Sequence, residues 1–259
     1  MGSLDGRRIV VTRRKGQAGS LVERLRELGA TVVEVPAIEI TPPADLGPLD
    51  AALGELDAYD WVVVTSPNAV AALLSRLTVQ GLFPRLSGKR TRLASVGPAT
   101  TAALRASFPQ DKVALEPKQD HRAEGLLAAF ADRDLAGRKV LLPMSTAGRG
   151  ELPEGLHARG ARVDVVPAYA TVEPDGLQGA VADCLEGGFD LALFASPSAV
   201  EAFARAAGDR ANGRPVAVIG PTTEAAARAA GFHVLGTAAP ATLEALVETA
   251  ERVLKWPRP

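Results

Sequence analysis

The sequence is poor in the residues that build disulfide scaffolds and nucleic-acid surfaces. Of its 259 residues only one is a cysteine, Cys184, which excludes a disulfide framework and a cysteine-cluster metal site. The 29 Lys and Arg residues are matched by 30 Asp and Glu, giving a formal net charge of −1, and aromatic residues make up 4%. Nucleic-acid binding depends on a basic surface and on aromatic stacking. We therefore expect no nucleic-acid partner.

Signals for membranes, secretion and metal binding are equally scarce. The apolar runs are strand-sized, well short of the about 20 residues that cross a bilayer, and residues 1–8 lack the apolar core of a signal peptide. The three histidines, His121, His157 and His233, have no metal-ligand spacing. We expect a cytoplasmic protein that uses neither a membrane nor a metal.

The length and composition are those of a folded globular chain. Hydrophobic residues make up 47% and charged residues 23%, a balance that leaves enough apolar surface to form a core. At about 100–200 residues per domain, the length allows one large domain or two small ones.

An internal repeat organises the chain. Residues 65–73 (TSPNAVAAL) recur as residues 195–203 (ASPSAVEAF), and residues 96–104 (VGPATTAAL) recur as residues 219–227 (IGPTTEAAA). A block that begins with GRRIVV at Gly6 and ends at Pro36 has a counterpart that begins with GRKVLL at Gly137 and ends at Pro167. Blocks that recur in the same order indicate a duplicated unit.

Each unit alternates short apolar runs with helical patterns. Strands that alternate with helices predict parallel sheets covered on both faces, so we expect a doubly wound α/β fold, flavodoxin-like, with five strands per unit. Residues 35–41 and 166–174, each with a proline near both ends, are interpreted as connections between units. Periodicity leaves open whether each unit is its own domain. The expected strands are residues 9–11, 32–35, 61–64, 93–96, 113–115, 140–142, 163–166, 191–194, 216–219 and 234–236.

Four strand-to-helix turns share a construction that can bind anions. A serine or glycine ends each strand and a proline takes the first helical position, at residues 66–67, 97–98, 196–197 and 220–221. The unpaired N–H groups of a helix start attract anions, and these turns lie at the carboxyl ends of parallel strands, where doubly wound folds bind ligands. Each turn taken alone is more often an ordinary helix start than a binding site. Four turns in two matched pairs make a multiply anionic ligand, held between two sheets, an equal alternative.

Three further candidates follow from the residues themselves. Arg13, just after the first strand, is placed to reach an anion, with a solvated loop as the alternative. Residues 145–150 (STAGRG) resemble a phosphate loop in composition only and lack its spacing, so they predict no nucleotide site. Tyr169, one of two tyrosines, lies in the second connection. It either packs there or acts through its hydroxyl in a cleft between domains.

A wider pattern extends over nearly the full length. It consists of the segments GRRIVVTR (6–13), VVEVPAIEI (32–40), DWVVVTSPNAV (60–70), VGPAT (96–100), AEGLL (123–127), GRKVLLP (137–143), VPAYATV (166–172), IGPTT (219–223) and ATLEAL (241–246). Each is weak alone, but in this order and spacing they resemble the uroporphyrinogen-III synthase family. The resemblance is specific because it depends on all of them jointly.

The resemblance implies a fold that the repeat leaves undecided. In this family the chain begins in one domain, crosses to build the second, and returns to finish the first. Carried over, one discontinuous domain takes residues 1–36 and 172–259, and the other takes residues 39–167. The connections 35–41 and 166–174 then form a two-stranded hinge, and each domain takes two strands from one repeat and three from the other. Such a hinge lets domains close about a substrate.

The resemblance also implies a reaction. Without a cofactor, the family closes hydroxymethylbilane to uroporphyrinogen III in tetrapyrrole biosynthesis, with inversion of ring D and loss of water. Departure of hydroxide from ring A gives an azafulvene, and attack through the substituted carbon of ring D gives a spiro intermediate that fragments and recloses. The substrate carries eight carboxylates, which suits helix starts as partners. The implied supplier is the deaminase that makes this substrate, and we expect a monomer.

Site residues carry over position by position. Tyr169 matches the family tyrosine that assists hydroxide departure as a proton donor, so it is the catalytic candidate. Many relatives have a charged or amide side chain where this chain has Met144 and Ala170. If those side chains meet carboxylates, this chain must use others, such as Arg149 or Arg13. The substrate-binding candidates are Arg13, Thr65, Ser66, Asn68, Thr100, Ser145, Arg149, Ser196, Pro197, Thr222 and Thr223.

Two other functions remain open on the sequence. A non-catalytic, two-lobed protein that closes on a multiply anionic small molecule would use the same helix starts. A nucleotide-dependent transferase would need a phosphate loop that the sequence lacks.

Overall fold

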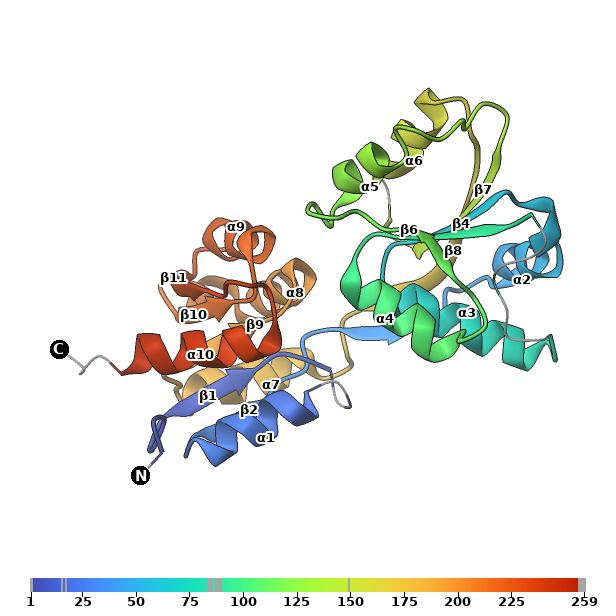
Figure 1. The fold of residues 1–259 in the computed structure, drawn as a ribbon. Helices are drawn as coiled ribbons and strands as arrows, with labels where there is room; N and C mark the ends of the chain where they lie inside the picture. The colour runs from blue at the N-terminus through green and yellow to red at the C-terminus, as the bar shows by residue number, and fades with distance from the viewer. Residues whose placement is uncertain are drawn as a thin grey trace. The chain divides into compact units, whose positions relative to one another are not determined.

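The chain divides into two compact units (Figure 1). The computed structural model describes residues 2–14, 16, 18–82, 86, 90–148 and 150–255. Unit 1 comprises Met1–Glu39 and Val172–Pro259, and unit 2 comprises Ile40–Thr171. Within the described ranges, no helix combines the length and the apolar character needed to span a bilayer.

Unit 1 is built on a five-stranded parallel sheet. Its strand order is β11-β10-β9-β1-β2, and all four neighbouring pairs are parallel. Renumbered within the unit, this is the flavodoxin-like order 2-1-3-4-5, which confirms the doubly wound prediction. The strands are β1 (Arg8–Val11), β2 (Thr31–Glu34), β9 (Leu191–Phe194), β10 (Pro215–Val218) and β11 (His233–Thr237).

Helices cover both faces of this sheet because its strands are apolar on both sides. Ile9 and Val11 of β1 belong to one core and Val10 belongs to the other, as the period of two in a strand requires. The first core is closed by α1 (Gly19–Glu27) and α10 (Leu243–Leu254). The second is closed by α7 (Leu177–Glu186), α8 (Pro197–Ala207) and α9 (Pro221–Ala229).

Unit 2 repeats this plan with one strand more. Its order is β3-β8-β7-β4-β5-β6, and the pairs from β8 to β6 are parallel. The strands are β3 (Glu39–Thr41), β4 (Trp61–Val64), β5 (Arg92–Ser95), β6 (Val113–Leu115), β7 (Lys139–Ser145) and β8 (Arg162–Val172). One face packs on α2 (Gly47–Gly54), α3 (Pro67–Val79) and α4 (Pro98–Ser107), and the other on α5 (Ala123–Ala129) and α6 (Glu151–Ala158).

The strand order interleaves the two sequence repeats. Unit 1 combines β1 and β2 of the first repeat with β9, β10 and β11 of the second, and unit 2 combines β4, β5 and β6 with β7 and β8. Five strands were expected in each sheet, and this is wrong for the sheet of unit 2, which has six strands. Residues 39–41 and 166–172, expected in connections, are strand: β3 lies beside β8, and β8 continues to Val172. A sheet edge offers unpaired backbone groups, and β3 occupies them.

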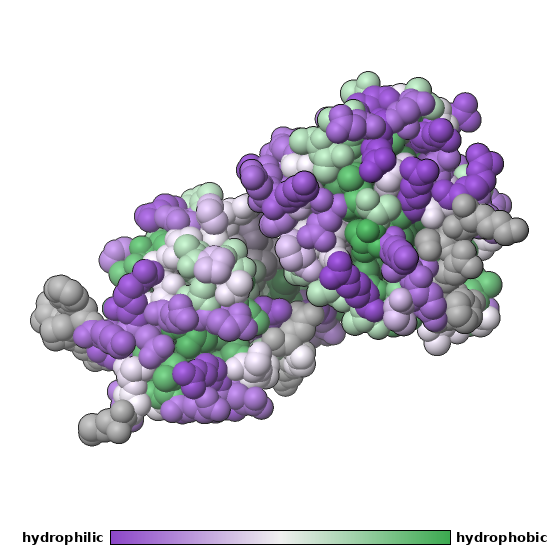
Figure 2. Space-filling view, viewed as in Figure 1, coloured by the Kyte–Doolittle hydropathy of each residue, from purple (hydrophilic) through white to green (hydrophobic). Residues whose placement is uncertain are grey.

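Hydrophilic residues dominate the visible face of each unit. In Figure 2 hydrophobic residues show as patches among hydrophilic ones. Among the described residues, the large apolar ones that are exposed are scattered along the chain: Val79, Leu82, Val165, Val172 and Leu235. Such single exposures are normal for a folded protein.

We expect the Phe203→Ala variant to lose about 3–5 kcal/mol of unfolding free energy. Phe203 is fully buried and lies edge-on to Phe194, with ring centroids 5.6 Å apart, so truncation leaves a cavity in the core of unit 1. Urea denaturation measures the loss. The Val79→Ala control, at a side chain that is 67% exposed, should stay within about 0.5 kcal/mol of the parent. An equal effect of both substitutions would contradict this account of the core.

Candidate functional site

The two Ser-Pro turns have the same geometry in both units. Ser66 caps α3, with its Oγ accepting the N–H of Ala69 at 3.1 Å, and Ser196 caps α8, with its Oγ accepting the N–H of Ala199 at 3.3 Å. Their backbones agree closely, with φ/ψ of −155°/153° and −161°/153°. Each turn follows a strand at the carboxyl edge of its sheet. The remaining N–H groups of these first turns are available to an anion.

Within the described part of the chain, no side chain caps the helix starts at the two Gly-Pro turns. Gly97 precedes α4 and Gly220 precedes α9, both in extended conformation and both followed by proline. At Gly97 a Cβ atom would lie 2.8 Å from the Cβ of His121, so a larger residue would displace that side chain. His121 therefore packs on this turn, which its isolated position in the sequence did not indicate. The uncapped N–H groups and the helix dipole favour a negatively charged ligand.

Two equivalent threonines stand in the first turns of α4 and α9. Thr100 and Thr223, each the third residue of its helix, are each 3% exposed. Neither hydroxyl makes a hydrogen bond to any part of the chain that the structure describes. Neither oxygen is among the buried polar atoms without a partner, so both hydroxyls reach solvent and are open to a ligand.

Tyr169 lies beside the Ser66 turn. It belongs to β8, and its hydroxyl oxygen is 3.1 Å from Ser66 Oγ. In the register of β7 and β8 it pairs with Ser145. The ring packs, partly buried, against the core beneath α2, α3 and α4. Two hydroxyl groups therefore meet at a helix start on the carboxyl edge of unit 2, an arrangement that can deliver a proton.

Arg13 lies at the carboxyl edge of unit 1. The preceding Thr12 is fixed there, because its Oγ1 donates to the carbonyl of Leu193 at 2.9 Å. The Nε atom of Arg13 is buried and has no hydrogen-bond partner among the residues that the structure describes. Burial, and to a smaller extent the neighbouring Arg14, lowers the pKa of Arg13 from its ordinary value. A half-buried guanidinium with an unused N–H is suited to an anion.

The structure gathers the described candidates at two sheet edges, one in each unit. Arg149 lies outside the described residues. Met144 and Ala170 are half-buried and supply no charge. Unit 2 carries Thr65, Ser66, Asn68, Thr100, Ser145 and Tyr169, and unit 1 carries Arg13, Ser196, Pro197, Thr222 and Thr223.

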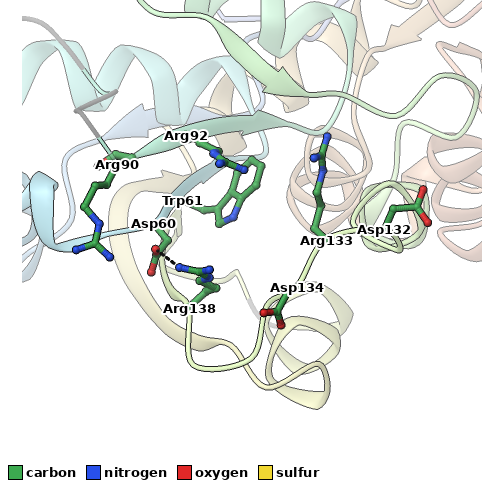
Figure 3. A pocket seen from close by; sticks show the side chains of 9 residues that line it. Asp60, Trp61, Arg90, Arg92, Asp132, Arg133, Asp134 and Arg138 are labelled. Carbon is green, nitrogen blue, oxygen red and sulfur yellow. Dashed lines mark hydrogen bonds and ion pairs between the residues drawn. The ribbon is translucent and has the colours of Figure 1, made fainter.

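A pocket of about 590 Å³ lies at the opposite end of the unit 2 sheet (Figure 3). Trp61 and Arg92, the first residues of β4 and β5, mark this as the amino edge, and none of the described candidates lines it. Asp60 pairs with Arg138 at 3.1 Å. Although burial opposes it, hydrogen bonds from Lys139 N–H and Arg138 lower the pKa of Asp60. The charges are nearly balanced among the lining residues Asp60, Trp61, Arg90, Thr91, Arg92, Asp132, Arg133, Asp134 and Arg138.

The chain is similar along most of its length to one family of known proteins. The family described as uroporphyrinogen-III synthase HemD matches residues 19–248. A uroporphyrinogen-III synthase of Synechococcus elongatus is 32% identical over 230 residues, covering 85% of this chain and 85% of that protein. A chloroplastic uroporphyrinogen-III synthase of Oryza sativa is 29% identical, covering 86% of this chain and 73% of that protein.

Solved structures agree in fold. A crystal structure of a mutant uroporphyrinogen III synthase from the extremely thermophilic bacterium Thermus thermophilus aligns with 96% of this chain and 99% of that one, with a TM-score of 0.71 and 18% identity. These findings confirm the resemblance that the sequence segments indicated. The chain belongs to the uroporphyrinogen-III synthase HemD family.

Proposed function

We propose that this chain converts hydroxymethylbilane to uroporphyrinogen III, with inversion of ring D and loss of water. The observation that carries this proposal is the match of residues 19–248 to the family, together with a uroporphyrinogen-III synthase that is 32% identical over 85% of both chains. The helix starts described above supply the donors that a substrate with eight carboxylates needs. No cofactor takes part in the proposed reaction.

The substrate carboxylates bind at the starts of α3, α4, α8 and α9. First-turn N–H groups and the unpartnered hydroxyls of Thr100 and Thr223 are the donors, and Arg13 adds a charge from unit 1. Holding the flexible tetrapyrrole at several points restricts its conformation. The restricted conformation favours attack through the substituted carbon of ring D over direct closure.

Tyr169 donates the proton that makes hydroxide a leaving group. Its O–H protonates the ring-A hydroxymethyl oxygen, the C–O bond breaks, and water departs from a cationic azafulvene. Ser66, 3.1 Å away, donates to the phenolic oxygen as that oxygen becomes negative. After the spiro intermediate fragments and recloses, the ring carbon that was attacked releases a proton, which returns to Tyr169. The net change is loss of one water.

The same proposal includes the location of the protein, its oligomeric state, the source of its substrate and its hinge. The protein acts as a cytoplasmic monomer supplied by the deaminase that makes its substrate. The family is not confined to one compartment, since the rice relative is chloroplastic. The chain passes between units at residues 39–40 and 171–172, in the neighbouring strands β3 and β8. This adjacency supports a two-stranded hinge.

The identity of the product tests the proposed function. Purified protein is incubated with porphobilinogen and its deaminase, and the oxidised products are separated by chromatography. We expect mainly uroporphyrin III, against uroporphyrin I when the protein is left out, because unassisted closure does not invert ring D. Uroporphyrin I alone would overturn the proposal and favour the non-catalytic, anion-binding alternative.

We expect Tyr169→Phe to lower kcat several-fold while KM stays within about twofold of the parent value. The substitution removes the proton donor but keeps the ring that packs on the unit 2 core, so the fold should persist. Single-turnover kinetics measure the chemical step and thermal melting checks the fold. Unchanged turnover would remove Tyr169 from the mechanism.

We expect Ser66→Ala to lower kcat by roughly twofold to tenfold, the equivalent of one neutral hydrogen bond. The same substitution removes an N-cap, which costs about 1 kcal/mol of stability. Thr242→Ala provides a matched control, because Thr242 Oγ1 caps α10 by accepting the N–H of Ala245 at 3.2 Å. It should lose similar stability with little change in kcat.

A double variant separates the two roles of Ser66. If Ser66 acts through Tyr169, Ser66→Ala should have almost no further effect on kcat in the Tyr169→Phe background. Full additivity of the two losses would mean that Ser66 contributes only as a helix cap.

A further inference from the structure

Each Gly-Pro helix is tied to the neighbouring edge strand by a threonine–glutamate pair. In unit 2, Thr101 Oγ1 donates to Glu116 Oε2 at 2.5 Å, and Ser95 Oγ lies 2.5 Å from the same threonine oxygen. In unit 1, Thr237 Oγ1 donates to Glu224 Oε2 at 2.6 Å. The unit 2 link joins the first turn of α4 to the residue that follows β6, and the unit 1 link joins the first turn of α9 to the last residue of β11.

The two pairs occupy equivalent positions. Thr101 and Glu224 are each the fourth residue of a helix, with N–H groups bonded to Gly97 and Gly220 at 3.0 and 2.9 Å. On the strand side, Leu115 pairs with Ala94 and Gly236 pairs with Ala217. Glu116 and Thr237 each come one residue later. Both pairings also shift register at the same step of the sheet.

The two units therefore make the same link with exchanged partners. Unit 2 has threonine on the helix and glutamate after the strand, and unit 1 has glutamate on the helix and threonine on the strand. The residue types at the two equivalent positions differ between the units, but in both units a hydrogen bond joins these positions. A helix or strand preference of either residue does not explain this exchange. A requirement for the link itself does.

The link acts next to the candidate binding groups. Thr101 directly follows Thr100, and Glu224 directly follows Thr223. Thr101 is 2% exposed and Ser95 is fully buried, so the threonine end of the unit 2 link is sheltered from water, whereas Glu116 is half-buried. Glu224 also accepts two hydrogen bonds from Arg228, at 2.9 and 2.7 Å. Fixing the fourth residue of each helix fixes the rotation of its first turn, and with it the N–H groups and hydroxyl offered to a carboxylate.

We propose that the pairs Thr101–Glu116 and Glu224–Thr237 are positioning residues that hold the carboxylate-binding starts of α4 and α9. By holding them, the pairs select the substrate conformation that leads to ring inversion. The inference rests on the proposed function, because it assigns these residues to that same site.

The first test removes one hydroxyl at a time. In Thr101→Val and in Thr237→Val we expect KM for hydroxymethylbilane to rise several-fold, kcat to change by less than about twofold, and the type I share of product to rise at saturating enzyme. Thr249→Val is the matched control. Thr249 is 4% exposed and its hydroxyl donates to Ala245 O inside α10. It should alter the melting temperature without altering KM or the product ratio.

The second test transplants the unit 1 link into unit 2. The triple variant Ser95→Val, Thr101→Glu, Glu116→Thr reproduces Val218, Glu224 and Thr237. Arg105 already stands four residues after position 101, as Arg228 stands four residues after Glu224. We expect the triple variant to have a KM within about twofold of the parent value. Thr101→Glu alone places a second carboxylate against Glu116. It should therefore raise KM further than Thr101→Val does.

The outcomes separate the two proposals. A parent protein that yields only type I product would refute the proposed function. A parent protein that yields type III product, with threonine-to-valine variants that melt earlier but keep KM and product ratio, would refute the positioning role alone. A folded triple variant whose KM stays as high as that of Thr101→Glu would refute it as well.

Discussion

The architecture depends on one geometric constraint, the shared direction of strands in a parallel sheet. Every strand in such a sheet delivers its carboxyl end to the same edge, and every crossover helix begins there. The first N–H groups of each helix have no intrahelical partner. In this chain the constraint operates twice, so the starts of α3 and α4 meet on one edge, and those of α8 and α9 on another. Arg13 and Tyr169 matter because they stand at these edges.

Because the two repeats are interleaved, each sheet is completed by strands from both of them. Neither repeat completes a flavodoxin-like sheet alone: β1 needs β9 as its neighbour, and β4 needs β7. Residue pairs that build the core are therefore distant in sequence. The hydrogen bond between Ser66 and Tyr169 likewise joins the two repeats, because its partners are 103 positions apart in the sequence. A duplication that had stayed consecutive would have separated them.

The features that could be predicted from the sequence are those with a local pattern, and the features that could not depend on contacts between distant residues. The run Trp61–Val64 is apolar on both faces and is typical of a buried strand from composition alone, and the Ser-Pro turns carry their own cap. In contrast, Glu39–Thr41 alternates apolar and polar residues but is too short, between two prolines, to predict a strand, and it lies at the edge of the sheet beside β8. The Thr101–Glu116 link and the pocket around Asp60 depend on register and loop packing, which no spacing in the sequence encodes.

The net charge of −1 is compatible with binding a polyanion, because most of the candidate hydrogen-bond donors are uncharged. Many charges are used in pairs away from the sheet edges, such as Arg76 with Asp50 at 2.6 Å, and Arg13 is the only charged residue among the described candidates. Backbone N–H and hydroxyl groups bind carboxylates without bringing a full positive charge. On the proposed reaction this is an advantage, because the azafulvene is cationic and nearby guanidinium groups would oppose its formation. Neutral donors hold the polyanion and leave the cation undisturbed.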